Sequence, residues 1–358
     1  MKIRKFIFLA LLIASFQLAK AQSTTQTIVD GLLEPAYYGK PFVSEIHSTI
    51  SKVELGYSKS YSEFNLLEEN QKFERPVVEM HLGMDAPLFA YQWGTAGNSY
   101  KWGVAMSLPL SVHVLEDMWD PVTAPVINTD YRFGSPRIRA IRNFSGNGFL
   151  KNISVSWLPI FHECTHLGDE ITIYRKDENF PITRINVSYE YTELQLTLND
   201  PNKSRENLNS FRIGGMYRIS NRGLGWYSIR PDAEATQPVE LLPSSYRLEY
   251  YGQYQFQRTS GFLASKRVMN ILSFEARNRL RYGIPMFRKV NDAWETTEVK
   301  ERMQWNLNLY FGWKFYPKSN LNHSISFLAH VYKGINPYGQ LRNYPSYPFY
   351  GVSLTYEP

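Results

Sequence analysis

The chain has 358 residues, a formal net charge of +6 and a single cysteine, Cys164. A single cysteine excludes an internal disulfide framework, so stability must come from buried surface or from a lipid environment. Aromatic residues make up 15% of the chain, yet the mean hydropathy is only −0.36. An aromatic-rich, moderately polar chain without a spanning run of about 18 apolar residues is typical of a β-barrel.

Residues 1–21 have the features of a secretory signal peptide. Three basic residues among the first five precede an apolar run over 6–16, which is too short to span a membrane. An Ala-Lys-Ala sequence ends at Ala21 and predicts cleavage there. Because this segment holds four bases and no acids, its removal lowers the net charge from +6 to +2. No basic patch then remains that would favour nucleic acid as a partner.

Residues 22–50 are polar and show no clear period, so we expect a periplasmic N-terminal lead-in. Further along, apolar residues recur at alternate positions. In the clearest stretch, all seven even positions from 102 to 114 are apolar, and the residues between them are mostly small or polar. Period two indicates a strand, and a small, polar opposite face suits the water-filled side of a barrel wall.

Twelve segments carry this pattern: 51–61, 76–93, 101–115, 128–142, 151–166, 182–198, 210–220, 246–257, 267–281, 302–316, 323–333 and 348–357. In the segment 182–198 the apolar residues switch from odd-numbered to even-numbered positions. We interpret it as one strand with a bulge, because an even number of strands returns both termini to the periplasm. The sequence thus predicts an all-β fold, a transmembrane antiparallel β-barrel of about twelve strands over 51–358, in the outer membrane. The expected partners are outer-membrane lipid and the barrel-assembly machinery, and no cofactor is expected.

The run 162–166, His-Glu-Cys-Thr-His, matches the H-E-x-x-H zinc-protease motif, with Glu163 as general base. That motif requires a helix, on which residues i and i+4 are neighbours. Here a strand pattern leads into the run, and on a strand the two histidines lie about 13 Å apart. Glu190 and Glu193 are available as a third ligand but have no supporting pattern. A zinc metallopeptidase is therefore only a second alternative, and we expect no metal.

In a strand over 151–166 without a bulge, alternate residues point to the same face. His162, Cys164 and His166 then lie on the polar face of the strand. We therefore expect His162, His166, Asp169 and Glu170 to form a polar cluster in the lumen near the outer mouth. On this interpretation the protein is a barrel for solute passage or binding, or one with a structural role in the envelope, and not an enzyme.

A lipid hydrolase is the first alternative. Outer-membrane phospholipases and lipid A deacylases carry a His-x-Ser pair on one barrel strand, and His162 and Cys164 have that spacing with a thiol in place of the hydroxyl. Those enzymes meet lipid at the outer wall, whereas parity places this pair inside. The sequence also identifies no residue to orient His162. Neither the substrate nor the solute follows from the sequence.

The run 162–170, His-Glu-Cys-Thr-His-Leu-Gly-Asp-Glu, resembles the H-x-S-S-H-L-G-D-E signature of an uncharacterised bacterial family. Supporting matches lie at 128–134 and 336–340, and the resemblance extends over 75–358. It implies an exported outer-membrane barrel of unknown activity. Cys164 and Thr165 replace the usual serines, which puts a serine nucleophile in doubt. The family rarely has Glu at position 163, which implies that the H-E-x-x-H match is accidental.

Overall fold

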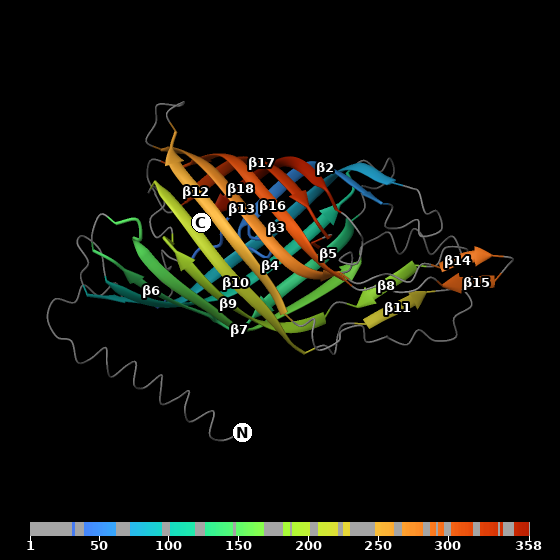
Figure 1. The fold of residues 1–358 in the computed structure, drawn as a ribbon, viewed down its shortest axis with the longest axis horizontal. Helices are drawn as coiled ribbons and strands as arrows, with labels where there is room; N and C mark the ends of the chain where they lie inside the picture. Colours follow the sequence, from blue (N-terminus) through green and yellow to red (C-terminus); the bar gives the residue numbers. More distant parts are fainter. Residues whose placement is uncertain are drawn as a thin grey trace, which may run out of the picture.

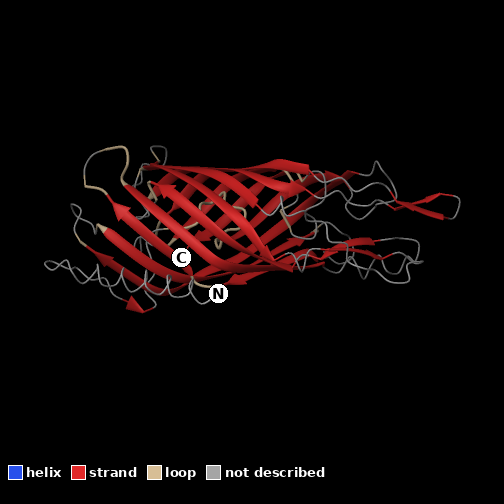
Figure 2. Ribbon diagram, turned by 60° about the horizontal axis from the view of Figure 1, so that its bottom comes forward, coloured by secondary structure: helices blue, strands red, loops and turns tan. Residues whose placement is uncertain are grey.

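Twelve antiparallel strands close into a barrel (Figures 1 and 2). The computed structural model describes residues 31–32, 39–61, 72–94, 101–118, 126–145, 148–167, 182–186, 188–200, 207–220, 225–229, 248–260, 267–281, 287–290, 293–296, 302–317, 323–335, 337–338 and 347–357. Among these residues, no helix is long and apolar enough to span a bilayer. The predicted signal peptide, 1–21, and its cleavage site lie outside the described residues.

The wall consists of β2 (Ser51–Tyr61), β3 (Lys72–Trp93), β4 (Trp102–Glu116), β5 (Val126–Gly134) with β6 (Arg137–Asn143), β7 (Asn152–Leu167), β9 (Ser188–Leu198), β10 (Leu208–Ser220), β12 (Leu248–Thr259), β13 (Val268–Arg281), β16 (Arg302–Phe315), β17 (Ser324–Lys333) and β18 (Phe349–Glu357). Counted with β5 and β6 as one interrupted strand, the wall has the predicted twelve. The last strand, β18, pairs with β2 and closes the barrel, with Tyr356 opposite Ser51. The two ends of the wall therefore lie on the same side, as an even strand number requires.

Two short two-stranded sheets extend beyond the wall at one end of the barrel (Figure 1). They are β8 (Ile182–Asn186) with β11 (Gly225–Ile229), and β14 (Phe287–Val290) with β15 (Ala293–Thr296). The predicted segment 182–198 contributes one strand to the wall, as expected, but that strand, β9, is formed by 188–198, while 182–186 form β8 and pair with β11 beyond the wall. A further short strand, β1 (Gly31–Leu32), pairs with β3.

Side chains alternate between the two faces of the wall. On β2, Leu55 on the outer face is 57% exposed, whereas Glu54 on the inner face is fully buried. On β18, Leu354 is 55% exposed and Ser353 is buried. Large exposed apolar side chains occur on strands all around the wall. Soluble monomers rarely expose so much contiguous apolar surface, so the outer face is built for lipid.

Residues 39–50 lie inside the barrel, where nearly all of them are buried. We call this stretch the lumen segment. Its Val43 and Ile50 pack against Tyr310 and other apolar side chains of the inner wall. The Val43 N–H donates to Gln255 Oε1 at 3.1 Å, and the Ser44 N–H donates to Ser273 Oγ at 3.1 Å.

Charged contacts hold the same segment in place. Arg212 Nη1 donates to Glu45 Oε2 at 2.9 Å, and the Gly39 N–H donates to Asp200 Oδ2 at 2.9 Å. Burial raises the pKa of the Asp200 carboxyl above its ordinary value. The sequence predicts a periplasmic lead-in over 22–50, but the part that the structure describes, 39–50, lies in the lumen. The reason is that its backbone N–H groups and its charged side chain form hydrogen bonds and an ion pair with the polar inner wall.

Candidate functional site

Two neighbouring wall strands change face at the same level. Ser135 and Pro136 interrupt the wall between β5 and β6, and the pairing of β7 with β9 shifts register between Leu158 and Phe161. Pro159, within that shift, has no N–H to give to the ladder, which makes it a natural place for a bulge.

The two interruptions are joined to each other. The Ser135 N–H donates to the Ile160 carbonyl oxygen at 2.8 Å, and the Ile160 N–H donates to Ser135 Oγ at 3.0 Å. We call this level of the wall the kink. Before it, even-numbered side chains of β7 such as Ser154 face the lumen, and beyond it odd-numbered ones such as Glu163 do.

The kink places His162 and Cys164 on the outer wall. The His162 ring lies 5.0 Å from the ring of Phe133, which is itself 50% exposed on the outer face of β5. The predicted position of both residues in the lumen is therefore wrong, because the sequence argument assumed a strand without a bulge. Glu163 faces inward instead and lies 3.4 Å from Arg132 Nε.

The remaining members of the predicted polar cluster are not brought together with His162. His166 belongs to β7 and is opposite Thr129 of β5, but its side chain is not described. Asp169 and Glu170 lie outside the described residues. Since His162 and His166 both belong to a strand, the helical geometry that the H-E-x-x-H motif requires is absent from β7.

On the outer wall, β9 brings two further polar side chains beside this pair. His162 is opposite Glu190, and Cys164 is opposite Ser188. His162 Nδ1 lies 3.1 Å from Glu190 Oε1, and both side chains are partly exposed. We call His162, Cys164 and Glu190 the outer-wall site.

The outer-wall site has the order of groups needed for nucleophilic catalysis. The Glu190 carboxylate holds Nδ1 of His162, which leaves Nε2 free to accept a proton. Cys164, two residues further along β7, lies on the same face as His162 and supplies a thiol. A base that is oriented by a carboxylate and stands beside a nucleophile is the general logic of acyl transfer.

From the sequence, Glu190 is a candidate only as a zinc ligand, and Ser188 is not a candidate site residue. The sequence does contain a sign of the outward orientation, since Pro136 and Pro159 interrupt two segments that otherwise alternate strictly. The pairing of His162 with Glu190 could not be predicted, because 27 residues separate them and the register across β7 and β9 fixes it.

No family model and no curated protein matches the chain. Among solved structures, the chain is similar to the outer membrane phospholipase A from Escherichia coli, with 11% identity, 89% of this chain and 97% of that chain covered, and a TM-score of 0.42. It is also similar to the CymD monoaromatic hydrocarbon channel, with 6% identity, 86% of this chain and 87% of that chain covered, and a TM-score of 0.33. For OpdQ of Pseudomonas aeruginosa the identity is 9%, 86% of this chain and 96% of that chain are covered, and the TM-score is 0.26. At these identities the likeness concerns the outer-membrane barrel architecture alone.

Proposed function

We propose that this protein is an outer-membrane enzyme that cleaves acyl esters of membrane lipids. Cys164 is the nucleophile, His162 the general base and Glu190 the residue that positions His162. The observation that supports this most directly is the hydrogen bond between His162 and Glu190 on the lipid-facing side of the wall, at 3.1 Å. The sequence gives two reasons against a hydrolase: the pair was expected to face the lumen, and no residue was identified to orient His162. The contact with Glu190 on the outer wall removes both.

The reaction proceeds in two steps. His162 Nε2 accepts the thiol proton of Cys164, and the sulfur attacks the ester carbonyl carbon of the lipid. His162 returns the proton to the departing lysolipid oxygen, which leaves an acyl thioester on Cys164. In the second step His162 takes a proton from water as the water oxygen attacks the thioester carbonyl carbon. The C–S bond breaks, the fatty acid leaves, and His162 returns its proton to the Cys164 sulfur.

The position of the site suits a lipid substrate. Tyr131 and Phe133 of β5 are 41% and 50% exposed on the outer face, and in register they are opposite Cys164 and His162. Acyl chains can pack on these rings while the ester reaches the thiol from the bilayer, without entering the lumen. The lipid that surrounds the barrel then also supplies the substrate.

The test is release of fatty acid from phospholipid or lipid A by the purified protein in mixed micelles. Wild type is compared with Cys164→Ala, His162→Ala and Ser188→Ala. We expect the first two variants to lose activity by about 10²- to 10⁴-fold. We expect Ser188→Ala to retain it, since its hydroxyl is on the other strand. Hydrolysis that survives in Cys164→Ala, or no hydrolysis by wild type, would overturn the proposal.

Solute passage or binding is the second candidate, and the polar inner wall favours it. In the structure the lumen segment occupies part of that interior, so passage requires the segment to move. Export with cleavage after Ala21 and insertion by the barrel-assembly machinery belong to either proposal. The N-terminus of the mature protein, read by sequencing from membranes, should then be Gln22.

A further inference from the structure

Two acidic side chains face each other inside the barrel, far from the outer-wall site. Glu54 of β2 is directly opposite Glu79 of β3, and Lys52 is directly opposite His81. All four side chains are buried against the lumen, with at most 6% exposed. Like charges directly opposite in a sheet are destabilising, so this pair of carboxylates requires a proton or a cation between them.

The polar atoms of this group are close but do not hydrogen-bond to one another. Ligand atoms of Glu54, Glu79 and His81 all lie within 4.8 Å of one another. Both carboxylate oxygens of Glu54 and both ring nitrogens of His81 lack a hydrogen-bond partner among the described residues. Their nearest charged contacts are long: His81 Nε2 lies 3.7 Å from Glu79 Oε2, and Lys52 Nζ lies 3.5 Å from Glu54 Oε2.

These separations are those of ligands around an ion. A charge-assisted hydrogen bond brings nitrogen and oxygen to about 2.8 Å. Two ligands bound tetrahedrally at about 2.1 Å from a metal are instead about 3.4 Å apart. His81 Nε2 and Glu79 Oε2, at 3.7 Å, are close to this separation.

His330 contacts the same group through Glu54, whose Oε1 lies 3.4 Å from His330 Nδ1. The Asn308 amide nitrogen donates to the Ser44 carbonyl oxygen at 2.8 Å, so its Oδ1 is an acceptor. His330 Nε2, 2.7 Å from that Oδ1, is therefore the donor. In the neutral imidazole this leaves the Nδ1 lone pair facing Glu54, so this pair also requires a proton or a cation between the two acceptors.

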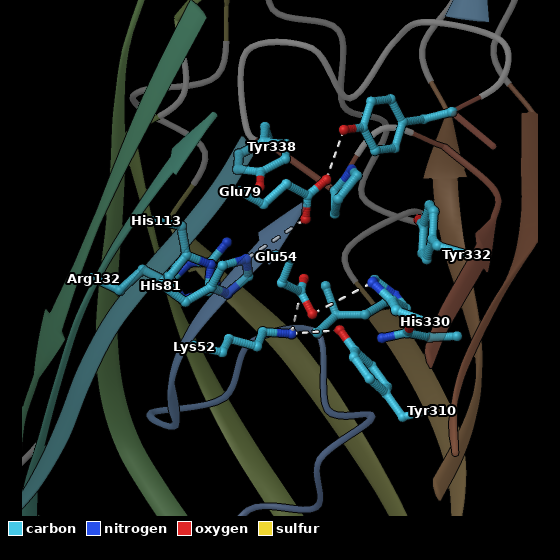
Figure 3. A pocket seen from close by; sticks show the side chains of 14 residues that line it. Lys52, Glu54, Glu79, His81, His113, Arg132, Tyr310, His330, Tyr332 and Tyr338 are labelled. Carbon is cyan, nitrogen blue, oxygen red and sulfur yellow. Dashed lines mark hydrogen bonds and ion pairs between the residues drawn. The ribbon is translucent and has the colours of Figure 1, made fainter. Parts of the chain in front are cut away.

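A small pocket lies beside these groups (Figure 3). Ile46 of the lumen segment lines it, and so do Tyr338 and Tyr347 from beyond the end of β17. The Tyr347 hydroxyl donates to Glu79 Oε1 at 2.6 Å and so leaves Oε2 directed towards His81.

We propose that Glu54, Glu79 and His81 bind a divalent transition-metal ion inside the barrel. Two carboxylates and one imidazole are ligand types that Zn²⁺ accepts, and three protein ligands leave a fourth position open. The proposal is independent of the lipid hydrolase.

The test uses the full-length protein in detergent, stripped with a chelator, dialysed and then titrated with ZnCl₂. Bound zinc is measured by equilibrium dialysis and elemental analysis. Wild type is compared with Glu79→Gln and His81→Ala. The matched control is Glu275→Gln, which changes another buried inner-wall carboxylate, one that is paired with Arg277 at 2.8 Å.

We expect one Zn²⁺ per chain in wild type and in Glu275→Gln, and an affinity at least about tenfold weaker in the two ligand variants. Wild type that binds no stoichiometric zinc, or equal losses in all three variants, would overturn the proposal. Circular dichroism and the heat-dependent gel mobility of barrels check folding. If the ligand variants do not fold, the absorption spectrum of wild type with CoCl₂ tests the metal site instead. Visible bands of tetrahedral Co²⁺ support the site, and a spectrum equal to that of free Co²⁺ refutes it.

Discussion

Ser135 and Ile160 exchange backbone and side-chain hydrogen bonds across β5 and β7, at 2.8 and 3.0 Å, at the level where both strands change face. This contact holds the kink that turns His162 and Cys164 from the lumen to the outer wall. Without the kink the same residues would line the interior, where no lipid could reach them. The proposed chemistry thus depends on a one-residue shift of register.

The outward orientation of Cys164 can be measured without changing any residue near it, since it is the only cysteine in the chain. A nitroxide attached to its thiol in lipid vesicles should collide more often with oxygen, which concentrates in lipid, than with a water-soluble nickel chelate. The control is Leu354→Cys in a Cys164→Ser background, since Leu354 is exposed on the outer face of β18. A label on Cys164 that prefers the nickel chelate would place the residue in water and contradict the structure.

Glu190 should act through His162 and not through substrate binding. We expect Glu190→Ala to lower kcat by about tenfold or more, equivalent to about 1.4 kcal/mol of transition-state stabilisation, with KM little changed. Glu190→Gln, which keeps an acceptor for the ring, should lose less. Leu196→Ala, on the same outer face of β9, is the control. A rise in KM with constant kcat would instead assign Glu190 to lipid binding.

The lumen segment should limit ion flow through the barrel. We expect low conductance from wild type in planar bilayers and a clear increase after deletion of residues 39–48. The double variant Glu45→Ala/Arg212→Ala should give an intermediate effect, because it removes the 2.9 Å ion pair without leaving one buried charge alone. Equal conductance in all three proteins would show that the segment does not close the pore.

Gly83 should be intolerant of a side chain because the lumen segment passes against it. An added Cβ would lie 2.5 Å from the backbone carbonyl carbon and oxygen of Thr49. Gly83→Ala should therefore lower the free energy of unfolding by about 1–3 kcal/mol in urea titrations in detergent. Gly252→Ala, where nothing lies within 4 Å of the new Cβ, should leave the stability nearly unchanged. Similar losses in both variants would argue against the close contact with Thr49.

The alternation of apolar and polar residues is a local property, and it was sufficient to predict the barrel. Each of the twelve predicted segments corresponds to a wall strand, and the polar set between Trp102 and Val114 faces the lumen as expected. This works because the side-chain period of a strand is two, whatever lies beside it. The outer-membrane architecture follows from the same regularity.

The chemistry depends on neighbours across strands, which the linear pattern does not contain. The pairing of His162 with Glu190, and that of Glu54 with Glu79, are fixed by hydrogen-bonded register between strands. The burial of 39–50 depends on partners such as Gln255 and Ser273, more than 200 residues away in the sequence. The sequence by itself therefore determined the strands and the kind of membrane wall they build. Only the tertiary structure decided which side chains meet, because one extra residue in a strand reverses the face of every residue after it.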